Sequence, residues 1–173
     1  MSQRARFVPR EELARLLEER RRAGSLGRVV LATGCFEVLH AGHVGYLEDA
    51  RSRGDCLIVA LNGDGSVREL KGEGRPIAPL EDRAAVLCAL AAVDYVTAFH
   101  EPTLEDTLRI LRPDVHAKGT DYTPDEVPEH GVDAELGIEI AICGEPKTHS
   151  STDLIARVRG PIEATVLDTP HTE

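Results

Sequence analysis

The stretch "ATGCFEVLHAGHVGYLEDAR", from Ala32 to Arg51, follows the apolar run "RVVLAT" and leads into a segment with the pattern of a helix. Two histidines, His40 and His43, lie at its centre, and Gly42 stands between them. A helix that begins near Gly42 directs unpaired backbone N–H groups and the positive end of its dipole toward the preceding turn. Glycine has no Cβ, so a phosphate could approach the backbone closely there. The stretch therefore predicts a phosphate site.

Short strands and helices alternate on both sides of this stretch. Strands are expected at 28–33, 56–61, 94–99, 114–119 and 138–143, and helices at 9–24, 42–54, 79–93, 103–113 and 151–160. This alternation predicts an α/β, Rossmann-like fold, with a five-stranded parallel sheet and helices on both faces. Ligands bind such sheets beyond the carboxyl ends of the strands, where the strand order reverses. The two histidines follow the first of these strands and so lie in the favoured place.

The composition excludes several classes of protein. The 173 residues suffice for one domain with a real core. We find no apolar run near the roughly 20 residues of a membrane span, and "MSQRARFVPREE" has no stretch of signal-peptide type. The four cysteines form no CxxC pair, which favours a reducing, cytoplasmic setting. The net charge of −10 argues against nucleic-acid binding, so an anionic ligand would need a local basic site.

Two other roles for the histidines have to be weighed. Histidines three residues apart could bind a metal, but no third ligand lies at helical spacing and HExxH is absent, so we expect no metal site. A purely structural role remains open, because the pattern is short. The strand before it and the helix after it favour a ligand site instead.

Several motifs of the sequence resemble those of a known family. "GCFEVLHAGHVGYL" is similar to the GxFDxxHxGHxxxL signature of the HxGH nucleotidyltransferases, and "LKGEGRPIAPLEDRAAVLCALAAVDYV", "KGTDYTPDEV" and "SSTDLI" resemble the adenylyltransferase half of bacterial ADP-heptose synthases. The sugar-kinase half has no counterpart here, which implies the stand-alone heptose 1-phosphate adenylyltransferase form. The resemblance runs from about Arg28 to Arg159 and implies a nucleotidyltransferase domain (28–160). The charged helical pattern before it predicts an N-terminal helical extension (1–27), and the prolines and acids after it predict a flexible acidic tail (161–173).

The reaction implied by the resemblance is transfer of AMP from ATP, with Mg²⁺, to a sugar 1-phosphate. The nucleophile is already an anion, so alignment and charge stabilisation can carry catalysis. This agrees with a sequence that shows no Ser–His–Asp arrangement. The resemblance also implies a cytoplasmic homodimer or larger assembly. Two alternatives stay open: a cytidylyltransferase acting on a polyol phosphate or phosphonate, and a catalytically silent nucleotide-binding module.

Site residues follow from the resemblance position by position. His40 and His43, expected at an exposed helix entrance, and Lys71, in the mobile-looking loop "ELKGEGRP", are the expected catalytic residues. The residues expected to bind the nucleotide are Gly34, Cys35, Phe36, Gly42, Lys118, Gly119, Asp121, Ser150, Ser151 and Thr152. Those expected to bind the substrate are Glu37, Arg75 and Arg83.

Ordinary structural roles remain open for several of these residues. Lys71 could be a solvated surface lysine, and Arg83 could pair locally with Glu81 or Asp82. The "SST" run could be a simple N-cap. For Asp64 a structural role is favoured.

Two positions depart from the family patterns. Glu37 stands where the signature commonly has aspartate, and its extra methylene moves the carboxylate by roughly one bond length, where errors near ~1 Å matter in catalysis. Whether Glu37 orders the loop or faces the substrate is therefore open. Glu145 stands where cytidylyltransferases often carry arginine, which favours the heptose type.

Overall fold

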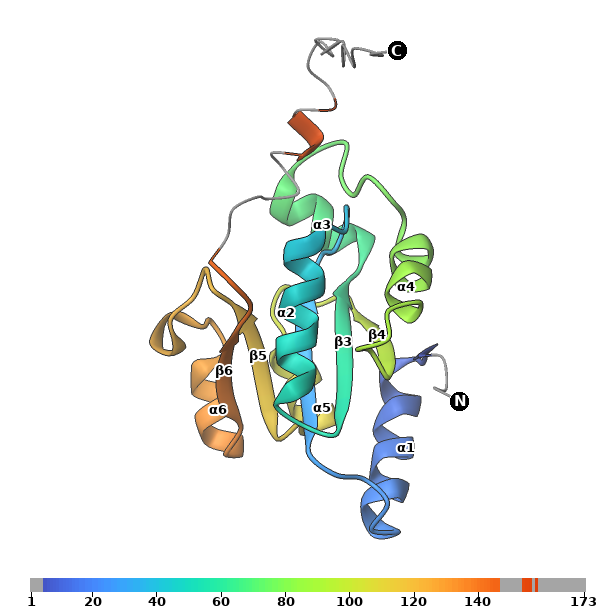
Figure 1. Ribbon diagram of the computed structural model, residues 1–173, viewed down its shortest axis with the longest axis vertical. Coiled ribbons are helices and arrows are strands. Elements are labelled where there is room, and N and C mark those ends of the chain that lie inside the picture. Colours follow the sequence, from blue (N-terminus) through green and yellow to red (C-terminus); the bar gives the residue numbers. More distant parts are fainter. Residues whose placement is uncertain (1–4, 147–153, 157, 159–173) are drawn as a thin grey trace, which may run out of the picture.

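The computed structural model describes residues 5–146, 154–156 and 158, which form a parallel sheet with helices on both faces (Figure 1). The strands are β1 (Arg6–Phe7), β2 (Val29–Gly34), β3 (Cys56–Asn62), β4 (Tyr95–Phe99), β5 (Val115–Gly119) and β6 (Glu139–Cys143). Their order is β1-β4-β3-β2-β5-β6, and every neighbouring pair is parallel. The predicted Rossmann-like α/β fold is confirmed, and the sheet has a sixth strand, β1, beyond the five expected.

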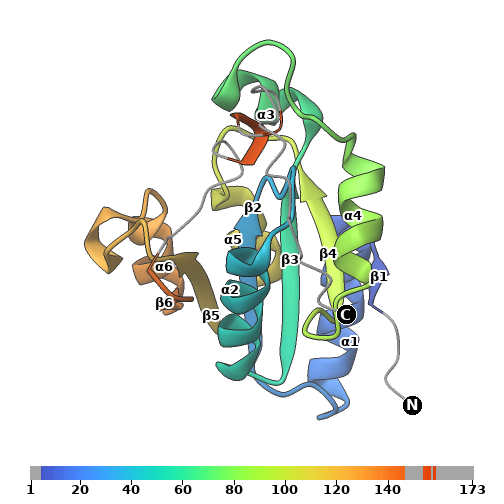
Figure 2. The ribbon, with the colours of Figure 1, turned by 45° about the horizontal axis from the view of Figure 1, so that its top comes forward.

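The helices are α1 (Arg10–Arg22), α2 (Ala41–Ser52), α3 (Asp64–Lys71), α4 (Leu80–Cys88), α5 (Glu105–Leu111) and α6 (His130–Leu136), with a 3₁₀ turn η1 (Pro124–Glu126). The final helix predicted at 151–160 is described only at 154–156 and 158, which are helical. This short segment lies next to α3 in both views (Figures 1 and 2). None of the helices in the described parts of the chain has the length and apolar character needed to cross a membrane.

Each strand of the sheet centre is buried on both faces. All seven residues of β3 are buried, which explains its unbroken apolar sequence. Val30 packs with α2 and α4 on one face, and Val29 packs with α1 and α5 on the other. In Figure 1 α2 lies in front of the sheet and α5 behind it. The two cores hold the strand ends in fixed positions, and these ends carry the site.

The segment 1–27 supplies both β1 and α1. Strand β1 pairs with β4, but its two residues are exposed, so the sequence carries no strand pattern there. Helix α1 buries Leu13 and Leu17 completely against the sheet. The segment predicted as an extension therefore shares the core of the domain. The predicted tail, 161–173, lies outside the described residues.

Two helices were not predicted from the sequence, α3 and α6. The run "NGDGS" at 62–66 has the composition of a turn, yet α3 begins inside it. Long-range contacts explain this difference, because the Ser66 hydroxyl donates to the carbonyl of His100 and Val67 is fully buried. Helix α4 is also shorter than predicted. In α3, tertiary contacts outweigh the local propensity.

The strand order reverses at β2. The chain passes from β2 through α2 to β3 on one side, and later returns to β5 on the other side of β2. Helix α2 begins at Ala41, directly after His40. The predicted position of the two-histidine stretch, beyond the carboxyl end of a strand at the reversal of the order, is therefore confirmed.

Candidate active site

The two histidines lie at the start of α2. His40 is the N-cap residue, with an extended backbone (φ −144°, ψ 171°), and His43 lies in the first helical turn. The centroids of their rings are 3.9 Å apart. The first N–H groups of a helix have no acceptor within the helix. Two imidazoles and a helix N-terminus thus meet in one place, an arrangement suited to phosphate oxygens.

The entrance of α2 is exposed at Ala41 and Gly42, as expected, but His40 and His43 are themselves half-buried. For His43 the reason is the ring of Phe36, a residue with a positive φ of 46°, which packs against it. The Phe36 ring centroid lies 5.2 Å from that of His43 and 6.4 Å from that of Tyr46. Gly34 makes room for this ring, because a Cβ at Gly34 would lie 2.9 Å from it. Gly34 and Phe36 therefore set the position of His43.

Gly42 and Gly45 offer a matched pair of substitutions within α2. A Cβ at Gly42 would lie 3.0 Å from the His40 ring, whereas a Cβ at Gly45 would meet nothing within 4 Å. We expect Gly42→Ala to displace the ring and to lower turnover about tenfold or more. We expect Gly45→Ala to keep turnover and to raise the free energy of unfolding by up to ~1 kcal/mol, since alanine favours helix over glycine. Steady-state rates and urea denaturation measure both effects, and equal turnover in the two variants would contradict the role of His40.

Glu37 is the centre of a buried charge cluster beside the histidines. Its side chain is 0% exposed, and its two oxygens accept hydrogen bonds from Arg75 Nε and Nη2 at 2.7 and 2.6 Å. Lys71 Nζ lies 3.0 Å from Glu37 Oε2, and the backbone N–H of Ile77 donates to Oε1 at 3.2 Å. The three residues Glu37, Lys71 and Arg75, predicted separately, are thus in direct contact. Lys71 is the last residue of α3 rather than part of a loop.

The cluster keeps the Glu37 carboxylate ionised. Burial alone would raise its pKa, but the hydrogen bonds from Arg75 and Lys71 outweigh burial and lower the pKa from 4.5 to about 2. A lowered folded-state pKa stabilises the fold above the unfolded value, and this stabilisation is lost as the pH falls. The relevant window therefore runs from pH 4.5 down to about 2.

We expect Glu37→Gln to flatten the acid dependence of stability in this window. The difference in unfolding free energy between the wild type and Glu37→Gln should shrink by about 3 kcal/mol between pH 5 and pH 2. Urea denaturation at several pH values measures it. The control is Glu135→Gln, which removes one partner of the exposed Arg109–Glu135 pair. Arg109 also lowers the pKa of Glu135, but water screens this exposed pair, so the variant should change the acid dependence far less. A constant difference for Glu37→Gln would contradict the ionised carboxylate.

Arg83 joins the ends of two strands to the helices that follow them. Its guanidinium donates to the carbonyls of Cys35, Asn62 and Ala78 and to Asp64 Oδ1, at 2.6 to 3.1 Å. The side chain is 1% exposed. Neither Glu81 nor Asp82, the local partners considered from the sequence, is among these contacts. The buried Arg83 side chain therefore supports the loop after β2 through its hydrogen bond to the Cys35 carbonyl.

Cys35 has its polar atoms engaged within the protein. Its carbonyl accepts from Arg83, and its Sγ lies 3.8 Å from Asn62 Oδ1. Burial raises the pKa of the Cys35 thiol, which disfavours a thiolate nucleophile. In the part of the chain that the structure describes, no group of three or more His, Cys, Asp or Glu side chains could hold a metal ion.

The end of β5 carries the next predicted residues. Lys118 is buried, and its Nζ lies 3.0 Å from Glu129 Oε2. Strand alternation places Lys118 on the face of α6, opposite the face that Ala117 shares with α2. The structure therefore brings Lys118 to Glu129 and not to the histidines. Gly119 ends β5, and Asp121 follows two residues later.

The carboxylates that pair with Lys118 and His116 were not identified from the sequence. Glu129, the partner of Lys118, also accepts a hydrogen bond from the Leu104 N–H at 3.3 Å. Asp133 is the partner of the buried His116, and its Oδ2 lies 2.9 Å from His116 Nδ1. These acids are 11 to 25 positions from their partners, and no local pattern connects them. Ser150, Ser151 and Thr152 lie outside the described residues.

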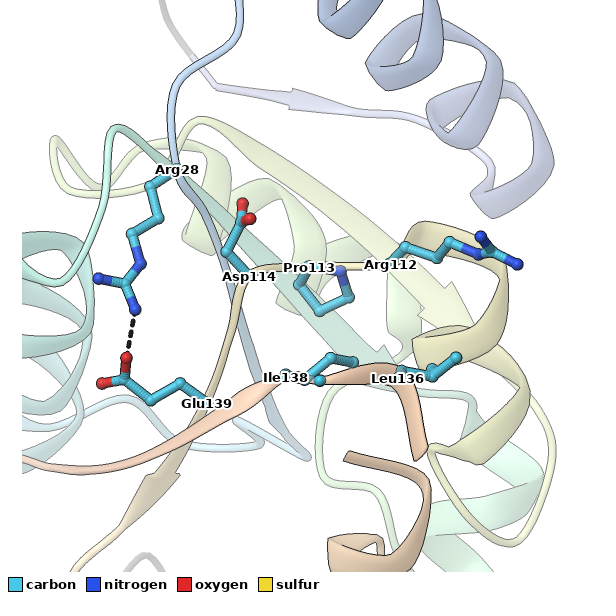
Figure 3. A pocket seen from close by; sticks show the side chains of 8 residues that line it. Arg28, Arg112, Pro113, Asp114, Leu136, Ile138 and Glu139 are labelled. Carbon is cyan, nitrogen blue, oxygen red and sulfur yellow. Dashed lines mark hydrogen bonds and ion pairs between the residues drawn. The ribbon is translucent and has the colours of Figure 1, made fainter. Parts of the chain in front are cut away.

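A hollow of about 490 Å³ lies at the other end of the sheet (Figure 3). Arg28, Asp114 and Glu139 line it, just before β2, at the start of β5 and at the start of β6. Arg28 pairs with Glu139, and Asp114 accepts the N–H of Val29. Two of its charged groups, Arg28 and Glu139, thus neutralise each other, and the hollow is far from the carboxyl ends of the strands.

The similarity of this chain to known proteins agrees with this geometry. Residues 31–157, from within β2 to the last described helical segment, match the family model described as cytidylyltransferase-like. The chain belongs to this family. Membership agrees with the fold, because the match includes the HxGH stretch and the parallel strands from β2 to β6.

Two relatives show how similar this chain is to known proteins. The bifunctional protein HldE of Alcanivorax borkumensis is 48% identical over 143 residues, 83% of this chain and 30% of that protein. The bifunctional protein HldE of Streptomyces coelicolor is 53% identical over 131 residues, 76% of this chain and 28% of that protein. The chain thus spans less than a third of the length of these relatives.

A solved structure resembles the fold as well. The crystal structure of the lipopolysaccharide core biosynthesis protein from Thermoplasma volcanium matches with a TM-score of 0.62 and 30% sequence identity. The match covers 70% of this chain and 99% of the other.

Proposed function

We propose that this protein transfers the adenylyl group of ATP to heptose 1-phosphate, giving ADP-heptose and pyrophosphate. The observation that carries the proposal is the pair His40 and His43 at the start of α2, beyond β2 where the strand order reverses. Membership of the cytidylyltransferase-like family supports nucleotidyl transfer. The similarity of several motifs to ADP-heptose synthases supports adenine and a heptose.

The chemistry needs little proton transfer. An oxygen of the sugar 1-phosphate attacks the α-phosphorus of ATP, and a new P–O bond forms. The bond from the α-phosphorus to the bridging oxygen breaks, and pyrophosphate leaves with the electron pair. His40 and His43 donate hydrogen bonds to the oxygens on which charge develops, and the start of α2 adds its N–H groups. Lys71, at the end of α3, contributes a positive charge to the phosphates.

Mg²⁺ enters this proposal as part of the ATP complex. It is usually held by one or two carboxylates together with substrate phosphates, rather than by an all-protein cage.

The test is a pyrophosphate-release assay with each nucleoside triphosphate against a panel of sugar 1-phosphates and glycerol 3-phosphate. We expect ATP with heptose 1-β-phosphate and Mg²⁺ to give the fastest turnover. A preference for CTP and a polyol phosphate would contradict the proposal and favour the cytidylyltransferase alternative. CTP and polyol phosphates are tested because the family is described as cytidylyltransferase-like. Nucleotide binding without release of pyrophosphate from any pair would instead indicate a silent binding module.

We further propose that the protein is a cytoplasmic homodimer or larger assembly, on family resemblance. Light scattering at micromolar concentration should give at least twice the mass of the 18.8 kDa chain. A monomer mass under these conditions would contradict this.

A further inference from the structure

Glu37 contacts both ends of a glycine-containing turn. The glycine turn, residues 72–74, follows α3, and both Gly72 and Gly74 have positive φ, at 90° and 79°. Lys71 precedes this turn and Arg75 follows it, and the side chains of both reach Glu37. In Figure 2 the chain arches from α3 to α4 through this region. The contacts therefore close the turn onto the loop that follows β2.

We propose that Glu37 is a positioning residue, which holds the glycine turn closed and presents Lys71 to the phosphates of the substrates. This inference rests on the proposed function, since it names the use of Lys71 in that reaction. It separates the roles of Lys71 and Arg75, which the resemblance placed together near the ligands.

The two cations are held differently. Arg75 is 14% exposed in its side chain and makes two hydrogen bonds to the carboxylate, the geometry in which an arginine–glutamate pair is most specific. Lys71 is 34% exposed, and its one ion pair with a described residue is the contact with Glu37 at 3.0 Å. Lysine is a flexible point charge with three donors. Arg75 is thus the fixed anchor, and Lys71 is the cation that exchanges Glu37 for phosphate.

The length of the glutamate side chain matters for this arrangement. Its carboxylate is completely buried and has contacts from Lys71, Arg75 and the N–H of Ile77. An aspartate would withdraw the oxygens by about one bond length and could not keep all of these contacts without a shift of the turn. The signature commonly has aspartate at this position, and the longer side chain of glutamate is therefore what allows these contacts to close the turn.

Limited proteolysis with a lysine-specific endoproteinase tests the closure without reference to the reaction. The chain has only three lysines, Lys71, Lys118 and Lys147. Cleavage after Lys71 reports opening of the turn, and cleavage after Lys118, buried in β5, reports unfolding of the domain. We expect Glu37→Gln to accelerate cleavage after Lys71 at least about tenfold, and these products to form well before any from Lys118. Glu135→Gln, the exposed control pair, should cleave like the wild type.

Kinetics test the presentation of Lys71. We expect Glu37→Gln to lower kcat about 10–100-fold while the KM for ATP changes less than about threefold, because the groups are present but misplaced. Glu37→Asp should lose less, since it keeps the charge. ATP with Mg²⁺ should also slow cleavage of the wild type after Lys71, because the phosphates then hold the amine.

The outcomes are separable. Unchanged cleavage after Lys71 in Glu37→Gln, or Lys118 products that appear together with those of Lys71, would overturn the closure. Normal kcat in Glu37→Gln, or no effect of ATP on cleavage of the wild type, would overturn the presentation of Lys71. Failure of the wild type to release pyrophosphate from any substrate pair would instead reject the proposed function, and the cleavage of Glu37→Gln would still decide the closure.

Discussion

His43→Ala is expected to lower turnover about 10²–10³-fold, the usual cost of losing one donor to a developing oxyanion. The ring lies in the first turn of α2, 3.9 Å from that of His40 between centroids. Its hydrogen bond strengthens as charge develops on the phosphoryl group, so the affinity for ATP should fall less than turnover. His40→Ala should behave similarly. Single-turnover rates and ATP titrations of each variant measure the two quantities.

The control for His43→Ala is His130→Ala, at the exposed start of α6. It should keep full turnover. His43 is half-buried against Phe36, so a modest drop in melting temperature is expected for His43→Ala, with the fold retained. A near-normal rate would remove His43 from catalysis. A variant that no longer folds would support the structural role of the histidines.

Arg83→Met is expected to destabilise the fold by about 3–5 kcal/mol, because several backbone carbonyls lose their hydrogen-bond donor, at about 1–3 kcal/mol for each that stays buried and unsatisfied. The guanidinium satisfies three backbone carbonyls and Asp64. Methionine replaces the apolar stem but none of the five N–H donors. The carbonyls of Cys35, Asn62 and Ala78 would then lack this partner. Urea denaturation with turnover measured on the folded fraction tests this.

Arg109→Met is the matched control for Arg83→Met. Arg109 likewise bonds to a carboxylate, with two hydrogen bonds to Glu135, but both side chains are exposed. Exposed pairs contribute about 0–1 kcal/mol, so this variant should unfold almost as the wild type does. Equal losses in the two variants would show that burial of Arg83 does not set its contribution.

Local patterns determined much of the fold. The unbroken apolar run of β3 and the helical pattern after His40 are readable because burial on both faces, and the spacing of a helix face, act over neighbouring residues. The order of strands and helices then implied a parallel sheet, and the position of the HxGH stretch at the end of β2 followed from it. The motif also indicated the family, because its glycines and histidines stand at the spacing of the GxFDxxHxGHxxxL signature.

Long-range contacts decided the rest. Helix α3 forms in a segment of turn composition because Ser66 and Val67 pack against distant parts of the chain. Lys118 is paired with Glu129, and Arg83 bonds the ends of β2 and β3 rather than a neighbouring acid. A cation in the sequence shows its charge but not its partner, since pairing depends on which side chains the folded sheet brings within hydrogen-bond distance.

Glu37 shows this division most clearly. The sequence identified the residue, its place in the signature and its departure from aspartate. It could not identify Arg75 as the partner, because 38 positions separate the two residues and no periodicity links them. Only the packing of α3 and the glycine turn beyond the ends of β2 and β3 brings them together. Local spacing thus determined where the site lies, and tertiary contact determined which of its charges are already held by the protein.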